Sequence, residues 1–153
     1  MKNFFLKKLT LPCVILMLVL CIAFTGCASR RTVTADEFTA VCADAGFTLE
    51  DISSQFGTDL ITTALTYSDE DSNAIAYYTF TKTSDAKSNY AKYYSSLNMG
   101  TENEKHIDSA EYNRYYAKTD SATALLYRNG NNIIYIAGHD TEALTALIET
   151  LGI

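Results

Sequence analysis

The fold is decided by the stretch ATALLYRNGNNIIYIA, which occupies residues 122–137. It contains two runs rich in aliphatic, β-branched and aromatic residues, which favour strands, on either side of Asn129-Gly130. Asn-Gly is the strongest short hairpin signal, because a type I′ turn needs a positive φ at both central residues. We therefore expect two strands, at 122–128 and 131–137, joined as a tight antiparallel hairpin.

The expected turn also sets the register of this hairpin. With Asn129 and Gly130 as the loop, Leu125 pairs with Ile134. Side chains two positions apart on a strand share a face. One face then collects a mostly apolar set, which we expect to be the core: Thr123, Leu125, Tyr127, Ile134 and Ile136.

Three more strands are predicted outside this hairpin. The segments 60–67 and 74–81 are rich in strand-forming residues and flank a polar turn at 68–72, so they form a second hairpin. The segment 112–119 alternates and gives another strand. The residues between the second hairpin's following helix and this strand, 98–109, are predicted to be a polar loop.

Helical periodicity and capping signals predict three helices. The first begins at a capping box formed by Thr34 and Glu37, and it ends at Gly46 in the left-handed conformation. The second and third carry apolar stripes at spacings of three and four residues. The three helices cover residues 35–45, 85–97 and the segment from Asp140 or Thr141 to Gly152.

The order of elements is therefore α-β-β-α-β-β-β-α, with room for one extra strand near residue 47. Tight hairpins imply antiparallel pairing, and helices packed on one face of an antiparallel sheet make an α+β fold. We expect residues 34–153 to form this single domain.

Residues 1–26 have the organisation of an export signal. Three lysines lie within the first eight residues, and the apolar run from Leu9 to Phe24 follows without any acidic residue. A spanning helix needs about 20 apolar residues. This run has 16 residues and contains Pro12, which favours a cleaved signal over a permanent span.

The end of this signal, Phe24-Thr25-Gly26-Cys27, resembles the lipobox of bacterial lipoproteins. The resemblance implies that the chain is cut before Cys27 and that the Cys27 thiol carries a diacylglyceryl group. Residues 27–33 are then the lipidated cysteine and its tether, and the domain is held to the membrane on its extracytoplasmic face. Phe24 departs from the aliphatic residue usual there. The alternative is an ordinary secretory signal with a cysteine at the boundary by chance.

The remaining chain is similar to small uncharacterised surface lipoproteins of Gram-positive, especially clostridial, bacteria. This resemblance implies a cell-surface location and supplies no activity, so only Cys27 carries over as a functional residue. It rests on several short motifs: Thr34-Ala35-Asp36-Glu37-Phe38, Gly46-Phe47, Tyr78-x-Phe80 before Asp85-Ala86, the Tyr-rich helix, Asn129-Gly130-Asn131 and Leu151-Gly152.

Charge and cysteine usage narrow the ligand classes. Residues 28–153 contain all 18 acidic residues and nine of the 12 Lys and Arg, a formal charge of −9. This sign disfavours nucleic acid and anionic lipid as ligands.

Removal of the signal takes away Cys13 and Cys21, and lipid consumes Cys27. Cys42 is then left alone, without a disulfide, on the apolar stripe of the first helix.

The usual catalytic and metal-binding patterns are missing from the sequence. His106 and His139 have no partner ligands at metal-site spacing. The run from Asp69 to Asp71 lacks the Gly and distal Glu of a calcium loop, so we interpret it as a hairpin turn. We expect no metal, no cofactor and no enzymatic activity.

Tyrosine is the unusual feature of this composition. All 11 tyrosines lie beyond the signal, and the chain has no Trp. On the strand at 112–119, Tyr112, Arg114 and Tyr116 form an alternate row with Lys118, which we expect to face away from the core. Tyrosine is enriched at interfaces, so this row is the candidate binding surface. The alternative is that Tyr simply suits a half-buried strand.

These features together predict a membrane-anchored extracytoplasmic lipoprotein that acts as a non-enzymatic binding module. We expect its partners to be the membrane, through lipid on Cys27, and a protein or envelope component. A lipoprotein that binds a small molecule or glycan is the first alternative, and an envelope hydrolase is the second.

Overall fold

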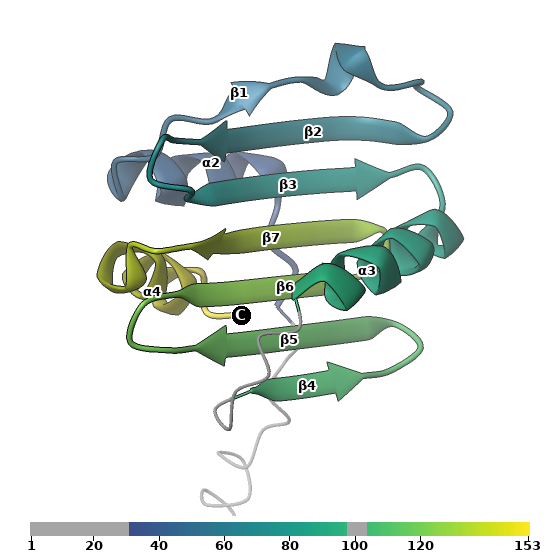
Figure 1. Cartoon of the computed structure of the whole chain (residues 1–153). Coiled ribbons are helices and arrows are strands. Elements are labelled where there is room, and N and C mark those ends of the chain that lie inside the picture. Colours follow the sequence, from purple (N-terminus) through teal and green to yellow (C-terminus); the bar gives the residue numbers. More distant parts are fainter. Residues whose placement is uncertain (1–30, 98–103) are drawn as a thin grey trace, which may run out of the picture.

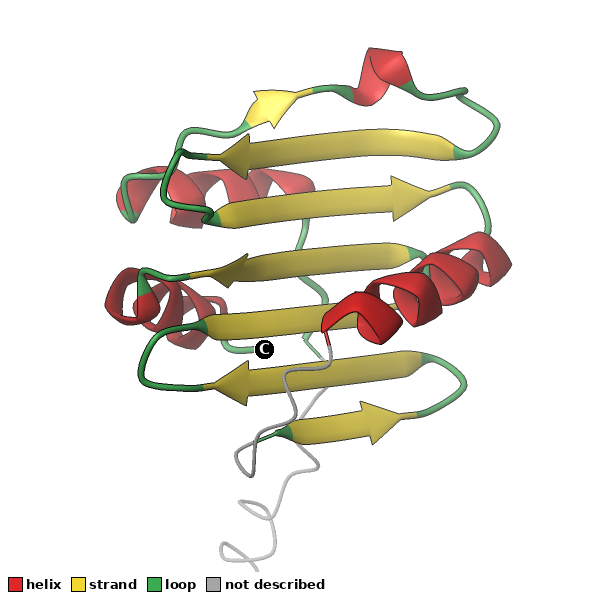
Figure 2. Ribbon diagram, in the orientation of Figure 1, coloured by secondary structure: helices red, strands yellow, loops and turns green. Residues whose placement is uncertain are grey.

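The computed structural model describes residues 31–97 and 104–153 and shows an α+β fold, as predicted. Seven strands form one antiparallel sheet in the order β1-β2-β3-β7-β6-β5-β4, and three helices pack on it (Figures 1 and 2). The segment predicted to be the signal, 1–26, and Cys27 lie outside the described residues. The elements are α2 (Ala35–Asp44), β1 (Glu50–Asp51), the short 3₁₀ helix η1 (Ser53–Gln55), β2 (Ile61–Ser68), β3 (Ala74–Phe80), α3 (Thr83–Leu97), β4 (Lys105–Asp108), β5 (Tyr112–Lys118), β6 (Thr123–Asn129), β7 (Asn132–Gly138) and α4 (Thr141–Leu151).

The helices cover both faces of the sheet, so the expectation that they share one face is wrong. Figure 1 shows α2 and α4 behind the sheet and α3 in front of it. The reason is visible in β6, where Leu125 and Leu126 point to opposite faces and both are 0% exposed. A strand that is apolar on both sides needs a cover on both sides.

The central hairpin forms, but its register differs from the prediction by two residues. Leu125 lies opposite Ile136 instead of Ile134, and the two loop residues are Gly130 and Asn131. Gly130 has φ +58, whereas Asn131 has no positive φ. A positive φ at the first loop residue alone is what a type II′ turn requires. Because two residues are one full period of a strand, every side chain keeps the face that was predicted.

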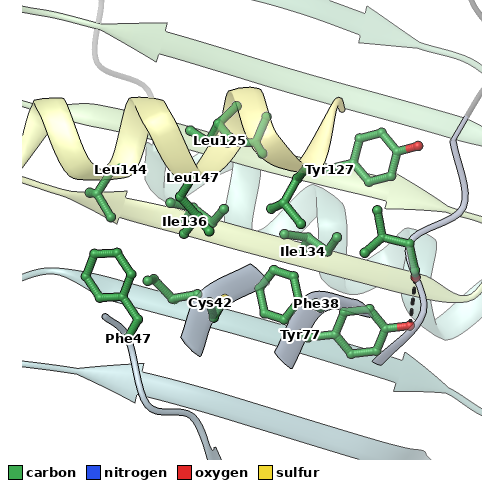
Figure 3. Packing of buried hydrophobic residues seen from close by; sticks show 14 residues of the cluster. Phe38, Cys42, Phe47, Tyr77, Leu125, Tyr127, Ile134, Ile136, Leu144 and Leu147 are labelled. Carbon is green, nitrogen blue, oxygen red and sulfur yellow. Dashed lines mark hydrogen bonds between the residues drawn. The ribbon is translucent and has the colours of Figure 1, made fainter. Parts of the chain in front are cut away.

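The predicted core face is confirmed as the larger of two apolar clusters. It lies between the sheet and helices α2 and α4, as Figure 3 shows. The second cluster lies under α3, whose predicted stripe packs into it through Ala86 and Tyr90. Buried strand residues of the first cluster are Ile75, Tyr77, Leu125, Tyr127, Ile134 and Ile136.

The helix ends follow the predicted capping signals. The Thr34 hydroxyl accepts a hydrogen bond from the Glu37 amide at the start of α2. At its end, Gly46 has φ +88, and the Phe47 amide donates back to the Cys42 carbonyl. This is the Schellman arrangement, which needs a left-handed residue. These capping residues confirm the first helix almost to the residue.

Two short strands extend the sheet at its edges. β4 falls inside the segment that was predicted to be a polar loop, and β1 is the extra strand expected near residue 47. All four residues of β4 are exposed. A short, charged strand of this kind is a common way to end a sheet, and it has no apolar alternation from which it could be predicted.

Residues 31–34, here called the strap, cross the α2–α4 face before α2 begins. Tyr127 donates its hydroxyl proton to the Arg31 carbonyl, and Tyr77 donates to the Val33 carbonyl at 3.2 Å (dashed in Figure 3). Val33 is only 2% exposed. The last part of the segment assigned to the tether therefore belongs to the packed domain.

Across residues 31–97 and 104–153, none of the helices combines the length and apolar character that a membrane span requires.

Candidate functional site

Among the described residues, no helix covers the β4–β5 end of the α2–α4 face of the sheet. Helix α4 packs over β6 and β7, so β5 and β4 lie beyond it (Figure 1). On β4, Lys105 lies opposite Tyr116 and Ile107 lies opposite Arg114. We call this surface the β4–β5 shelf, and it comprises Lys105, Ile107, Tyr112, Arg114, Tyr116 and Lys118.

The candidate residues Tyr112, Arg114 and Tyr116 all lie on the shelf, on the same face as α4. They are half-buried and do not point away from the core, because Tyr112 and Tyr116 pack against the α2–α4 cluster. The neighbouring Tyr115 faces α3 and is 0% exposed. The expected division into one core face and one solvent face is therefore wrong here, since both faces of the sheet bury apolar side chains.

Arg114 and Tyr116 hold each other in place. The guanidinium carbon of Arg114 lies 5.2 Å from the centre of the Tyr116 ring, a cation–π geometry. Arg114 also donates a hydrogen bond to the Ile153 backbone oxygen at 3.2 Å. Tyr112 meets the Tyr127 ring edge to face, with ring centres 5.4 Å apart. The side chains of Tyr112, Arg114 and Tyr116 are thus held by neighbours within the domain.

Two open hollows meet at Tyr116. The larger, about 400 Å³, lies toward the Lys118 end of β5, and the smaller, about 260 Å³, lies between β5 and α4. Both are open to solvent on one side, so an extended molecule could cross them. The larger is lined by Lys105, Tyr116, Lys118, Thr119 and Asp120, and the smaller by Arg114, Tyr116, Thr145, Ile148, Glu149, Gly152 and Ile153.

Among the described residues, no carboxylate forms an ion pair with the lysines around the larger hollow, Lys105 and Lys118, and Asp120 stands beside them without one. Lys105 could not be assigned to this surface from the sequence, because its strand was predicted to be a loop. The α4 wall was also missed, since helix placement depends on long-range packing.

A second polar cluster lies under α3 and was not predicted. Arg128 is 0% exposed, and its Nε donates to Asn113 while Asn113 donates to Asp108. Burial lowers the pKa of Arg128, and the nearby Asp108 carboxylate opposes that shift. The Tyr90 hydroxyl, buried nearby, has no hydrogen-bond partner among the described residues. An Arg inside an apolar strand was the available signal for this cluster.

The remaining polar candidates have structural partners. The His106 ring stacks on Tyr94 with centres 4.4 Å apart, and His139 Nδ1 lies 2.8 Å from the Ser121 carbonyl. Within the described part of the chain, no three His, Cys, Asp or Glu side chains are grouped to hold a metal ion. Cys42 is buried, and burial raises the pKa of its thiol to about 12.

The predicted turn after β2 is organised by Asp69. Its carboxylate accepts hydrogen bonds from the Asn73 amide and side chain, both at 2.9 Å, and from the Tyr67 hydroxyl at 3.0 Å. These bonds, those from Asn73 foremost, lower the pKa of Asp69. The carboxylate is occupied in shaping the hairpin, as the interpretation of this run as a turn requires.

Comparison with known proteins yields a distant structural likeness. No protein-family model matches the chain, and no curated protein matches it. A solved structure described as a GTP binding regulator from Thermotoga maritima superposes with a TM-score of 0.42 and 12% identity, covering 77% of this chain and 84% of that one. At this level of similarity, the likeness supports no statement about function.

Proposed function

We propose that the chain is a lipid-anchored extracytoplasmic lipoprotein that works as a non-enzymatic binding module for a protein or envelope component. The observation that carries the binding part is the β4–β5 shelf. It leaves Tyr112, Arg114 and Tyr116 half-exposed on a sheet whose central strands are covered on both faces. Aromatic residues and Arg are the side chains most enriched in binding surfaces.

The shape of the shelf favours an extended partner over a small enclosed ligand. Its two hollows lie side by side along β5, share Tyr116 and open to solvent. Small-molecule sites generally enclose most of their ligand. The glycan alternative fits this open shape better than the small-molecule alternative does. The hydrolase alternative has no supporting group of side chains at the shelf.

The anchoring part of the proposal rests on the lipobox-like sequence and on the position of the strap. Cys27 lies four residues before Arg31, where the described domain begins. Lipid on Cys27 would therefore keep the domain within a short reach of the membrane. Two or more acyl chains give stable attachment, at about 0.8 kcal/mol per buried CH₂.

Substitution of the two cysteines tests the anchor. We expect Cys27→Ala to abolish incorporation of a clickable fatty-acid analogue and to block cleavage by the lipoprotein signal peptidase. Cys42→Ala is the matched control, since it removes a thiol that is buried in the domain, and it should label normally. Normal labelling of the Cys27 variant would show that the anchor assignment is wrong.

Site-specific photocrosslinking on intact cells tests the binding surface. A benzophenone side chain at position 116 should trap a discrete partner, whereas the same group at Lys92, exposed on α3 across the sheet, should not. Equal crosslinking from both positions would mean that the shelf has no special role.

A further inference from the structure

The centre of the shelf is an aromatic platform. Arg114 covers one side of the Tyr116 ring, and the larger hollow lies next to this ring. The face of an aromatic ring carries partial negative charge and attracts C–H groups of partial positive charge. The C–H-rich face of a sugar ring has this character. Because Arg114 and the core fix the Tyr116 ring, little conformational entropy is lost when a sugar stacks on it.

Beyond this platform, the wall of the hollow provides both hydrogen-bond donors and acceptors. The Lys105 and Lys118 ammonium groups donate and the Asp120 carboxylate accepts, whereas the Thr119 hydroxyl is already bonded to the backbone of Ser121 and Ala122. Sugar hydroxyls act as donors and acceptors at once, so a mixed wall suits them. A site for an apolar helix would need an apolar ridge, and Ile107, 48% exposed, is the one exposed large hydrophobic residue on the shelf.

The charge at this end of the shelf adds a further requirement. Lys105 and Lys118, which have no ion-pair partner among the described residues, place two cations beside the Asp120 carboxylate in a chain whose net charge is −6. The local excess of positive charge is opposite in sign to the rest of the molecule. Complementarity of this kind selects partners of the opposite sign. The hollow is therefore suited to a sugar that bears an anionic group.

We infer that the β4–β5 shelf binds a segment of acidic glycan, with a sugar ring on Tyr116 and its carboxylate or phosphate between Lys105 and Lys118. This inference rests on the proposed binding function and names the ligand class for the same surface. The volume of the larger hollow, about 400 Å³, lies within the range of small-ligand sites. The second hollow, along α4, then takes the next part of the glycan.

Calorimetric titration of the full chain in detergent micelles tests this assignment with matched probes. The probes are a galacturonic acid hexamer, the same hexamer as its methyl ester, and a glutamate hexapeptide. We expect the acid hexamer to bind and the neutral ester to bind at least about tenfold more weakly. Raising the sodium chloride concentration from ~0.05 M to ~0.5 M should weaken binding of the acid hexamer, because salt screens exposed charges.

Substitutions with a charge-matched control locate the site. The double variant Lys105→Gln with Lys118→Gln should lower the affinity for the acid hexamer about tenfold, because it removes two exposed ion pairs with the ligand. Lys82→Gln with Lys92→Gln makes the same charge change on exposed residues away from the shelf and should leave affinity unchanged. Tyr116→Leu should lose most of the affinity, because it removes the ring on which the sugar stacks.

The outcomes separate the ligand class from the binding function itself. Equal affinity for acid and ester would overturn the requirement for an anionic group, and equal affinity for the glutamate peptide would overturn the glycan. If no glycan binds while position 116 still crosslinks a protein on cells, the ligand class is wrong and the proposed function stands. Absence of both signals would remove the proposed function as well.

Discussion

Removal of the buried Arg128 side chain should destabilise the domain far more than removal of any other arginine of the sheet. Its guanidinium bonds four acceptors, namely Asn113 Oδ1 and the carbonyls of Gly130 at 2.9 Å, Ala110 at 3.1 Å and Ser109 at 3.3 Å. It thereby ties the β4–β5 connection to the β6–β7 turn. In Arg128→Met the stem is preserved, and all four acceptors lose their donor.

The magnitude follows from which acceptors can reach water. The Ser109 and Ala110 carbonyls belong to residues that are partly or fully exposed, so they can rehydrate at little cost. Asn113 is 2% exposed and cannot. One unsatisfied buried acceptor costs about 1–3 kcal/mol, and loss of the cation near Asp108 adds little because this carboxylate is exposed to water. We expect Arg128→Met to reduce the free energy of unfolding by about 3 kcal/mol.

Urea unfolding followed by far-UV circular dichroism measures this loss. With a slope of about 1.5 kcal/mol per M urea, the midpoint should fall by about 2 M. Arg114→Met is the matched control, because its guanidinium is half-exposed and has one hydrogen bond and one ring contact. It should cost about 1 kcal/mol or less. If the two variants are equally stable, the reasoning about Arg128 is refuted.

Three further measurements test other parts of the structure. In a chain whose other three cysteines are replaced by Ser, the Cys42 thiol, with its pKa raised to about 12 by burial, should resist a thiol reagent at pH 8 and react at once after unfolding in urea. Fast reaction of this chain in its native state would contradict the burial of Cys42. Burial also raises the pKa of Tyr78 to about 12. Both pKa values are higher in the folded state than in the unfolded one, so the protonated forms of these two groups favour folding. This contribution to stability should be fully present below pH 9.0 and should be lost as the pH rises toward about 12. Tm measured at a series of pH values records the loss, and a constant Tm would contradict it. Gly138→Ala should lower the free energy of unfolding by about 2–3 kcal/mol, because a Cβ there would lie 2.7 Å from the Asn73 Cα. In Gly57→Ala, the new Cβ meets the end of a movable side chain, so the loss should be small. Equal losses in urea titrations would contradict the packing at Gly138.

Local signals in the sequence predicted the elements of this fold well. Thr34 and Gly46 bound the first helix because capping depends on residues within one turn of it. The faces of the central hairpin were also correct, although the register was not. Asn129 could have occupied a left-handed position, but the chain uses Gly130 alone there. Both turns suit the dipeptide, and the choice between them depends on the strand pairing around them.

Local signals in the sequence did not show which faces of the sheet the helices cover. The run from Ala124 to Tyr127 is apolar at every position, which is the pattern of a strand covered on both faces. The expectation of helices on one face rested on the tight hairpins, which indicate antiparallel pairing but do not show how many faces of the sheet are covered. The shelf was found through Tyr112, Arg114 and Tyr116, while its β4 side and its α4 wall depend on contacts distant in sequence.

The strap has a mechanical consequence for a protein held by its N-terminal end. If the chain is anchored at Cys27, drag on the domain pulls first on residues 31–34. These residues are bonded to Tyr127 on β6 and Tyr77 on β3, two inner strands of the sheet. Tension therefore enters the sheet near its middle, and β1 and β4, the short edge strands, carry none of it at first. A domain anchored in this way resists detachment of its short edge strands, which are its weakest part.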